Sequence, residues 1–182
     1  MPAEPAAQGS RGEAPADYAR ACITAVVTGR PLPAAPDSPF FTRRAACFVS
    51  LKRRGDLRGC IGTLSPAEPD LGLEIARNAR SASTQDPRFR PVRPDELDEL
   101  SVSVDVLSPS EPCTTADLDP ARYGVIVASG FRRGVLLPDL TGIDSVAVQL
   151  GVVLQKAGID PSEDFDVERF TVDRYREGEP SA

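Results

Sequence analysis

Residues 57–63 read Leu-Arg-Gly-Cys-Ile-Gly-Thr and hold the groups best suited to chemistry in this chain. Cys60 is a possible nucleophile, and Arg58 places a positive charge two residues before it. Gly59 and Gly62 lack a Cβ, so the backbone there can come close to a ligand or to another element. The combination predicts a site for a small anionic or polar molecule, with backbone amides cradling the anion. The ligand-binding residues of this segment would be Arg58, Gly59, Cys60, Gly62 and Thr63.

Cys60 has two interpretations. Its thiol is either a reactive or ligand-lining group, or a small buried side chain in a strand. In the second case Gly59 and Gly62 only relieve a bulge or a tight packing contact. The chain contains no histidine, which removes every Cys-His or Ser-His-Asp arrangement and the commonest general base near neutral pH. We predict Cys60 as the candidate catalytic residue and leave open whether the protein is an enzyme.

Arg58 also has two interpretations. Regular alternation along a strand would place its side chain on the same face as Cys60, where it could clamp an anion. It could instead form a structural ion pair with a carboxylate such as Asp86. The segment Asp86-Pro87-Arg88-Phe89 offers that acceptor and a second guanidinium, and bidentate geometry would suit a locked loop. We expect Asp86 and Phe89 to support the site and Arg58 or Arg88 to contact the ligand.

Composition and charge narrow the function further. The 182 residues are 41% hydrophobic, enough for one domain with a core that needs no disulfide or structural metal. The net charge is -6, yet residues 43–58 carry six basic side chains and residues 77–93 carry five arginines. An acidic chain with concentrated basic segments suits a discrete anion better than a nucleic acid. We therefore expect a small metabolite as the partner, and we do not expect nucleic acid.

Several classes of site have no counterpart in the sequence. The four cysteines form no Cys-x-x-Cys pair, so we predict no metal site. No Walker or Gly-x-Gly-x-x-Gly sequence is available to hold a nucleotide, and we predict no cofactor. No apolar run approaches the roughly 20 residues of a membrane span, and residues 1–15 lack the apolar core of a secretory signal. A cytoplasmic protein without a membrane partner is expected.

The periodicity of the chain predicts its elements and its class. Residues 1–15 read as a disordered tail and residues 177–182 as a flexible one, with a single domain between them at 16–176. Hairpins join most neighbouring strands, which favours an α+β fold with a mixed, mainly antiparallel sheet and three helices. Helices are expected near 17–28, 71–84 and 146–154, and strands near 45–51, 57–61, 100–106, 123–127, 135–137 and 167–175.

The segment 57–63 resembles the signature of the AMMECR domain, known in prokaryotes as protein A of the AmmeMemoRadiSam system. Four further blocks are similar to blocks of this family in the same order, and the resemblance covers roughly residues 16–175. These blocks are residues 47–52, 86–89, 101–109 and 134–138.

The resemblance implies a fold of two unequal lobes with a cleft between them, lined by the signature segment. Genes of this family often accompany those of a Memo-type protein and a radical S-adenosylmethionine (radical SAM) enzyme, which implies a shared pathway. The function expected is therefore binding or transformation of a small anionic or polar metabolite in the interlobe cleft, within that pathway. The alternative is a noncatalytic regulatory or adaptor module that binds protein or RNA.

Overall fold

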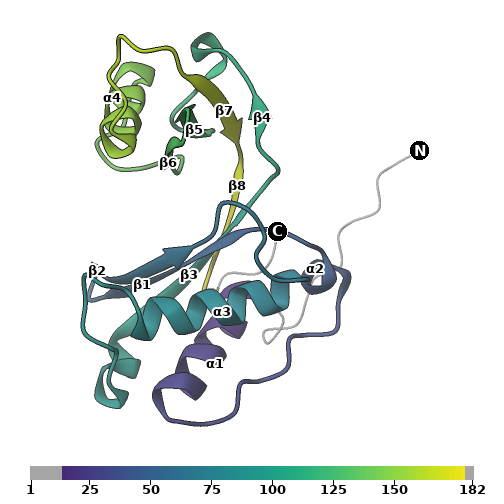
Figure 1. The fold of residues 1–182 in the computed structure, drawn as a ribbon. Coiled ribbons are helices and arrows are strands. Elements are labelled where there is room, and N and C mark those ends of the chain that lie inside the picture. Colours follow the sequence, from purple (N-terminus) through teal and green to yellow (C-terminus); the bar gives the residue numbers. More distant parts are fainter. Residues whose placement is uncertain (1–13, 179–182) are drawn as a thin grey trace. The chain divides into compact units, whose positions relative to one another are not determined.

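The computed structural model describes residues 14–178, which divide into two units of unequal size (Figure 1). Unit 1 contains the described residues up to Val106 and from Arg174 onward, and unit 2 contains Leu107–Asp173. Each unit has its own four-stranded sheet and its own hydrophobic core. The cleft expected between two lobes stays a prediction.

Unit 1 combines a sheet with helices on one of its faces. The strand order is β2-β1-β3-β8, and Figure 1 shows α1 and α3 against the same face of this sheet. The strands are β1 (Cys47–Arg53), β2 (Asp56–Gly62), β3 (Leu100–Leu107) and β8 (Val172–Arg176). The helices are α1 (Pro15–Val27), the short α2 (Pro39–Thr42), α3 (Leu71–Thr84) and the 3-10 helix η1 (Pro94–Glu99).

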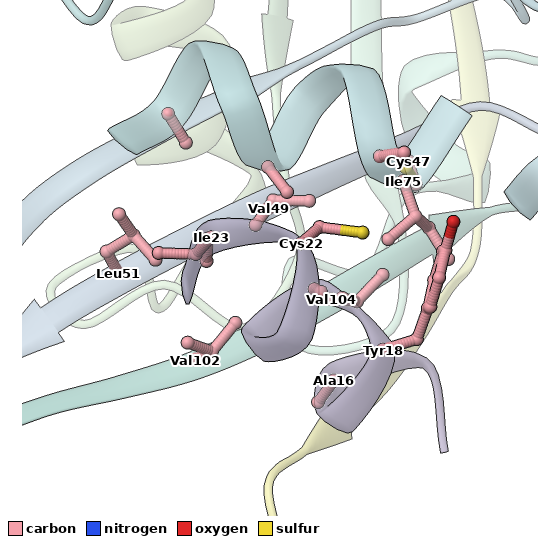
Figure 2. Close-up of a cluster of buried hydrophobic side chains, with 14 of the residues drawn as sticks. Ala16, Tyr18, Cys22, Ile23, Cys47, Val49, Leu51, Ile75, Val102 and Val104 are labelled. Atoms are coloured by element: carbon pink, nitrogen blue, oxygen red, sulfur yellow. The ribbon is translucent and has the colours of Figure 1, made fainter. Parts of the chain in front are cut away.

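The core of unit 1 follows from strand alternation. Cys47, Val49 and Leu51 of β1 are fully buried, while the residues between them are more exposed. Figure 2 shows Val49 and Leu51 packed with Val102 and Val104 of β3 against the side chains of α1 and α3. Helix α3 begins at Leu71, and the carboxylate of the preceding Asp70 accepts the amide of Leu73 at 2.8 Å and so caps the helix. One face of the sheet is therefore committed to the helices.

Unit 2 is a smaller sheet covered by one helix. Its strand order is β4-β7-β5-β6, and α4 packs against β5 and β6. Ser145 caps the start of α4, and Gly158, in the left-handed conformation at φ 66°, ends it. The elements are β4 (Glu111–Pro112), the 3-10 helix η2 (Thr115–Asp117), β5 (Gly124–Ser129), β6 (Arg132–Leu136), α4 (Val146–Ala157) and β7 (Asp166–Phe170).

The α+β class is confirmed, but the strands form two sheets and every pair whose register is described is antiparallel. The single strand expected at 167–175 is two strands, β7 in one sheet and β8 in the other. They part at Thr171. Its amide donates to Ser108 Oγ at 2.9 Å, and its carbonyl accepts from Ser108 N at 3.0 Å. A strand can change partners without any change in its apolar pattern, so the sequence did not show this break.

The described elements and contacts reach slightly beyond the boundaries predicted for the domain. Pro15 is buried and begins α1, although it was placed in the N-terminal tail. Glu177, placed in the C-terminal tail, accepts two hydrogen bonds from Arg20 at 2.6 and 3.0 Å and one from Val102 N at 2.6 Å. Arg20 also donates to the carbonyls of Leu97 and Leu100. The remainder of both predicted tails lies outside the described residues.

Replacing Glu177 with alanine removes the acceptor of these three bonds. We expect the free energy of unfolding to fall by about 1–2 kcal/mol, because hydrogen bonds to charged groups contribute roughly 1.5–3 kcal/mol and this carboxylate is partly hydrated. Urea unfolding followed by circular dichroism measures the change. Asp37→Ala, which removes an exposed carboxylate, is the matched control. Equal stability of Glu177→Ala and the wild type would show that the chain end contributes nothing.

Candidate functional site

A β-bulge interrupts β2 at Arg58. Ser50 of β1 faces Cys60 and Leu51 faces Gly59, but Lys52 faces Leu57, so Arg58 has no opposite residue. The expectation that Arg58 and Cys60 share a face assumed regular alternation, which this bulge breaks. The two side chains have no hydrogen-bonding partner in common.

Arg58 is held in a structural ion pair. Its Nε and Nη2 donate to the two carboxylate oxygens of Glu96, each at 3.0 Å, and its remaining bonds go to the carbonyls of Arg90 at 3.0 Å and Pro91 at 3.4 Å. The side chains of Arg58 and Glu96 are only 14% and 6% exposed. The hydrogen bonds from Arg58 lower the pKa of Glu96 to about 2. Of the two interpretations of Arg58, the geometry favours the ion pair, with Glu96 in the place proposed for Asp86.

Asp86 and Arg88 together occupy the free edge of the sheet at Cys60. β2 is the first strand of its sheet, so its outer amides and carbonyls have no strand beside them. Asp86 Oδ2 accepts the Cys60 amide at 2.9 Å, and Arg88 Nη2 donates to the Cys60 carbonyl at 3.1 Å. The two side chains thus make the bonds that a neighbouring strand would make.

The Asp86–Arg88 pair is itself bidentate. Arg88 Nη2 lies 2.7 Å from Asp86 Oδ2, and Nε lies 2.9 Å from Oδ1, which also accepts the Arg88 amide at 3.1 Å. Asp86 is 2% exposed, and these bonds, with the one from the Cys60 amide, hold the pKa of its carboxyl far below its ordinary value. Phe89 supports the arrangement with its ring 5.5 Å from the Arg88 guanidinium carbon and 6.0 Å from that of Arg58.

The thiol of Cys60 is half-buried between strands. Ser50 Oγ donates to Cys60 Sγ at 3.2 Å. Because the outer edge of Cys60 bonds Asp86 and Arg88, Ser50 and Cys60 form a non-hydrogen-bonded pair, the type in which opposite side chains lie closest. Arg88 is 54% exposed, and no hydrogen bond from its Nη1 to residues 14–178 is seen. Cys60 therefore contacts a hydroxyl through its thiol and a solvent-accessible guanidinium through its carbonyl.

The two glycines are explained by packing. A Cβ on Gly59 would lie 2.3 Å from the carbonyl oxygen of Ala82 in α3, and one on Gly62 would lie 2.2 Å from Cγ of Phe48. Neither residue has a positive φ. The amides of Cys60 and Thr63 already donate, the latter to the carbonyl of Cys47 at 3.1 Å. The predicted cradle of free amides thus has two of its donors engaged within the fold.

Thr63 is tied to a carboxylate that the sequence interpretation missed. Its hydroxyl donates to Glu74 Oε1, and Glu74 Oε2 accepts the amides of Ala67 at 2.8 Å and Glu68 at 2.7 Å. Glu74 is fully buried in the first turns of α3. An acidic residue next to Ile75 on the apolar face of that helix was the available signal, because a buried charge must find donors. Thr63 therefore fixes the loop before α3.

The structure thus brings together Cys60, Asp86, Arg88 and Phe89, adds Ser50, and directs Arg58 and Thr63 to other carboxylates. Among residues 14–178, no group of three or more His, Cys, Asp or Glu side chains is placed to hold a metal ion. Within the same range, none of the helices has the length and apolar character needed to cross a membrane.

Comparison with known proteins places this site in a family. The AMMECR1 family model matches residues 16–178. The chain belongs to the AMMECR1 family. It is similar to a Thermotoga maritima protein, 59% identical over 140 residues that cover 75% of this chain and 80% of the relative. A Methanosarcina barkeri protein is 34% identical over 188 residues, covering 93% and 91% of the two chains.

A solved structure of an uncharacterised Pyrococcus horikoshii protein has the same fold, with a TM-score of 0.81 and 30% identity, over 94% of this chain and 95% of that one. A longer Clostridium acetobutylicum relative is 51% identical over 130 residues, which are 71% of this chain and 28% of that protein. These similarities establish the family and the fold. They assign no reaction.

The Glu96–Arg58 ion pair predicts that the free energy of unfolding falls at acidic pH. The pKa of Glu96 is lowered from 4.5 to about 2 in the folded chain, so its stabilising effect is complete above pH 4.5 and is lost as the pH falls toward 2. We expect Glu96→Gln to lower the free energy of unfolding by about 2–3 kcal/mol at pH 7 and by much less near pH 2.

Urea unfolding at several pH values between 7 and 2.5 measures this effect. Asp98→Asn, which changes an exposed carboxylate on the same 3-10 helix, is the control and should follow the wild type. Asp86 still titrates in the Glu96→Gln variant. The loss of stability of this variant in acid should therefore be reduced and not abolished. If the slope of stability against pH is the same in Glu96→Gln as in the wild type, the Glu96–Arg58 pair is ruled out as the source of the acid dependence.

Proposed function

We propose that this AMMECR1-family protein binds a small anionic or polar metabolite at Cys60 and either transforms it or passes it on in a pathway with Memo-type and radical SAM proteins. The observation that carries the proposal is the half-buried Cys60, whose thiol accepts from the Ser50 hydroxyl and whose backbone carbonyl accepts from the accessible guanidinium of Arg88. The pathway rests on the family resemblance alone. Four free cysteines fit a reducing cytoplasm, where we place the protein.

Cys60 differs from the other three cysteines. Cys22 and Cys47 are fully buried, and burial raises the pKa of their thiols to about 11 and about 12. Burial also raises the pKa of Cys113, although the nearby charge of Arg169 acts in the opposite direction. Thiols of raised pKa are poor nucleophiles and poor ligands near neutral pH. Cys22 and Cys47 are closed off by burial, whereas Cys60 is half-buried and lies beside Ser50 and Arg88.

Arg88 would bind a polar or anionic group mainly through the fixed direction of its remaining N–H donor, and less through its charge. Its Nε and Nη2 are engaged by Asp86 and by the Cys60 carbonyl, which leaves Nη1 to donate to a ligand. Asp86 neutralises the guanidinium charge, so the pair as a whole carries none. A carboxylate, phosphate or carbonyl oxygen near Cys60 would accept from a donor whose position is already fixed.

Base-assisted catalysis has little support at this site. The chain has no histidine, and the Asp86 carboxylate cannot accept a proton near neutral pH because its pKa is so strongly lowered. Both oxygens of Asp86 are also occupied by donors. We therefore assign Cys60 a lining role first, and a nucleophilic role would need a base from elsewhere.

Alkylation tests the role of Cys60. With iodoacetamide at pH 8, followed by peptide mass spectrometry, we expect Cys60 of the native protein to react at least roughly ten-fold faster than Cys22 and Cys47, whose thiols are buried and have raised pKa values. After incubation with a cytosolic metabolite extract, the wild type should retain a small molecule that Cys60→Ser loses. Cys113→Ser is the matched control and should keep it. Equal reactivity of Cys60 and Cys22, together with empty spectra in all three proteins, would end the proposal.

The adaptor alternative is favoured by one observation. Phe131, at the tip of the β5–β6 hairpin, is 99% exposed, although a free aromatic ring is costly in water. The arginines beside it are engaged: Arg132 bonds Glu163 and the carbonyl of Gly158, and Arg133 lies 3.7 Å from Glu168. With its charges paired, the tip fits a protein partner better than RNA.

In that alternative, purified Memo-type protein should bind the wild-type chain at least roughly ten-fold more tightly than Phe131→Ser, since an exposed aromatic anchor commonly contributes more than 1 kcal/mol. Isothermal titration calorimetry measures both affinities. Arg30→Gln, an exposed change in unit 1, is the control. Equal affinities, or no binding by either protein, would leave the metabolite site as the function to pursue.

A further inference from the structure

The face of the unit 1 sheet turned away from α1 and α3 carries a group of small polar side chains. In β1, Cys47, Val49 and Leu51 point into the core, so Ser50 and Lys52 point to the opposite face. We call this surface the polar face, and it consists of Ser50, Lys52, Cys60, Ser101 and Ser103.

The strand register places these groups next to one another. Ser50 lies opposite Cys60 on one side and opposite Ser103 on the other, and Lys52 lies opposite Ser101. The β1–β3 register runs unbroken through Lys52, and the next pair, Arg53 with Leu100, returns to the core side. The bulge in β2 therefore does not change the direction of Lys52.

Lys52 carries a positive charge on the polar face. It is exposed, and within residues 14–178 its amine has no described ion pair or hydrogen bond. The neighbouring Arg53 and Arg54 instead bind Glu99. On the same side of the sheet, Asp105 and Arg174 neutralise each other in a bidentate pair at 2.7 and 3.0 Å, and alternation along β8 places the exposed Arg176 on this side as well.

The distances suit a small ligand. Residues two apart on a strand are separated by about 7 Å, so the Cα of Lys52 lies about 7–8 Å from that of Cys60, diagonally across the pair. The hydroxyls of Ser101 and Ser103 belong to β3, on the other side of β1 from Cys60, and no hydrogen bond from either Oγ to residues 14–178 is seen. A molecule of a few carbon atoms could touch Cys60 with one end and Lys52 with the other.

From this arrangement we infer that Lys52 is a second binding residue of the Cys60 site, and that it holds a carboxylate or phosphate group of the metabolite. The inference rests on the proposed function and narrows its substrate class to small acids and phosphate esters. Arg88 cannot supply the net charge, because Asp86 neutralises it. Lysine supplies a compact charge to an oxyanion, and the free serine hydroxyls add directional donors.

Paired alkylating reagents test the charge at Cys60. Iodoacetate is anionic and iodoacetamide is neutral, so the ratio of their rates at Cys60 reports local positive potential independently of the intrinsic reactivity of the thiol. We expect Lys52→Gln to lower this ratio about three- to five-fold at low ionic strength and Lys52→Arg to restore it. Arg30→Gln is the control and should leave the ratio unchanged. An unchanged ratio in Lys52→Gln, with Cys60 still reactive, overturns the inference and leaves the proposed function standing.

A second measurement does not depend on the thiol. Titration of 15N-labelled protein with inorganic phosphate, and separately with succinate, should shift the amide resonances of Ser101 and Ser103 saturably in the wild type and in Lys52→Arg, but not in Lys52→Gln. Shifts that persist in Lys52→Gln, or no shifts in the wild type, overturn the inference. If neither reagent labels Cys60, the proposed role of Cys60 fails, and this titration alone decides whether Lys52 binds an anion.

Discussion

The ion pair of Asp86 and Arg88 fixes the environment of Cys60, because it satisfies the two backbone groups of that residue that face away from the sheet. An unprotected edge strand leaves its outer amides and carbonyls to water or to another chain. Here a carboxylate that is almost fully buried accepts the amide, and a guanidinium donates to the carbonyl. With its outer side occupied, Cys60 is set against Ser50 as a closely spaced pair, and the thiol is turned to the polar face.

The loop that supplies this pair is itself held from both ends. Val92 N donates to the carbonyl of Ser83 at 2.8 Å, which returns the loop to the end of α3, and Arg58 bonds the carbonyls of Arg90 and Pro91 as well as Glu96. The arginines of the basic segments therefore serve mainly to stabilise the fold, since most of them form an ion pair with a carboxylate. Within residues 14–178, Arg88 bonds the Cys60 carbonyl and is neutralised by Asp86, whereas Lys52, diagonal to Cys60, has no described carboxylate partner.

Local patterns were enough to predict the longer helices and most strands, but not the short elements α2, η1, β4 and η2, nor the partners of the strands. The alternation of 100–106 and the Asp70 cap of α3 are properties of short segments, and both were readable. The Glu96 partner of Arg58 lies 38 residues away, and the bulge at Arg58 depends on pairing with β1. The separation of β7 from β8 depends likewise on which strands they meet. A periodic pattern carries no information about such distant partners. Glu74 and the Ser50–Lys52 alternation were visible in the sequence, but their meaning required knowing which face is buried.

The glycines show how one segment can satisfy a structural demand and still form a site. Gly59 lets α3 approach β2 at Ala82, and Gly62 makes room for the ring of Phe48, so neither is needed to admit a ligand. These contacts pack β2 closely against α3 and β1, and the thiol of Cys60 lies against Ser50. Asp86, the carboxylate bonded to the Cys60 amide, is committed to the sheet edge and does not serve as a base. The geometry is therefore better matched to holding an acid between Lys52 and Cys60 than to activating the thiol, and any chemistry at Cys60 requires a group that a partner or the ligand itself brings.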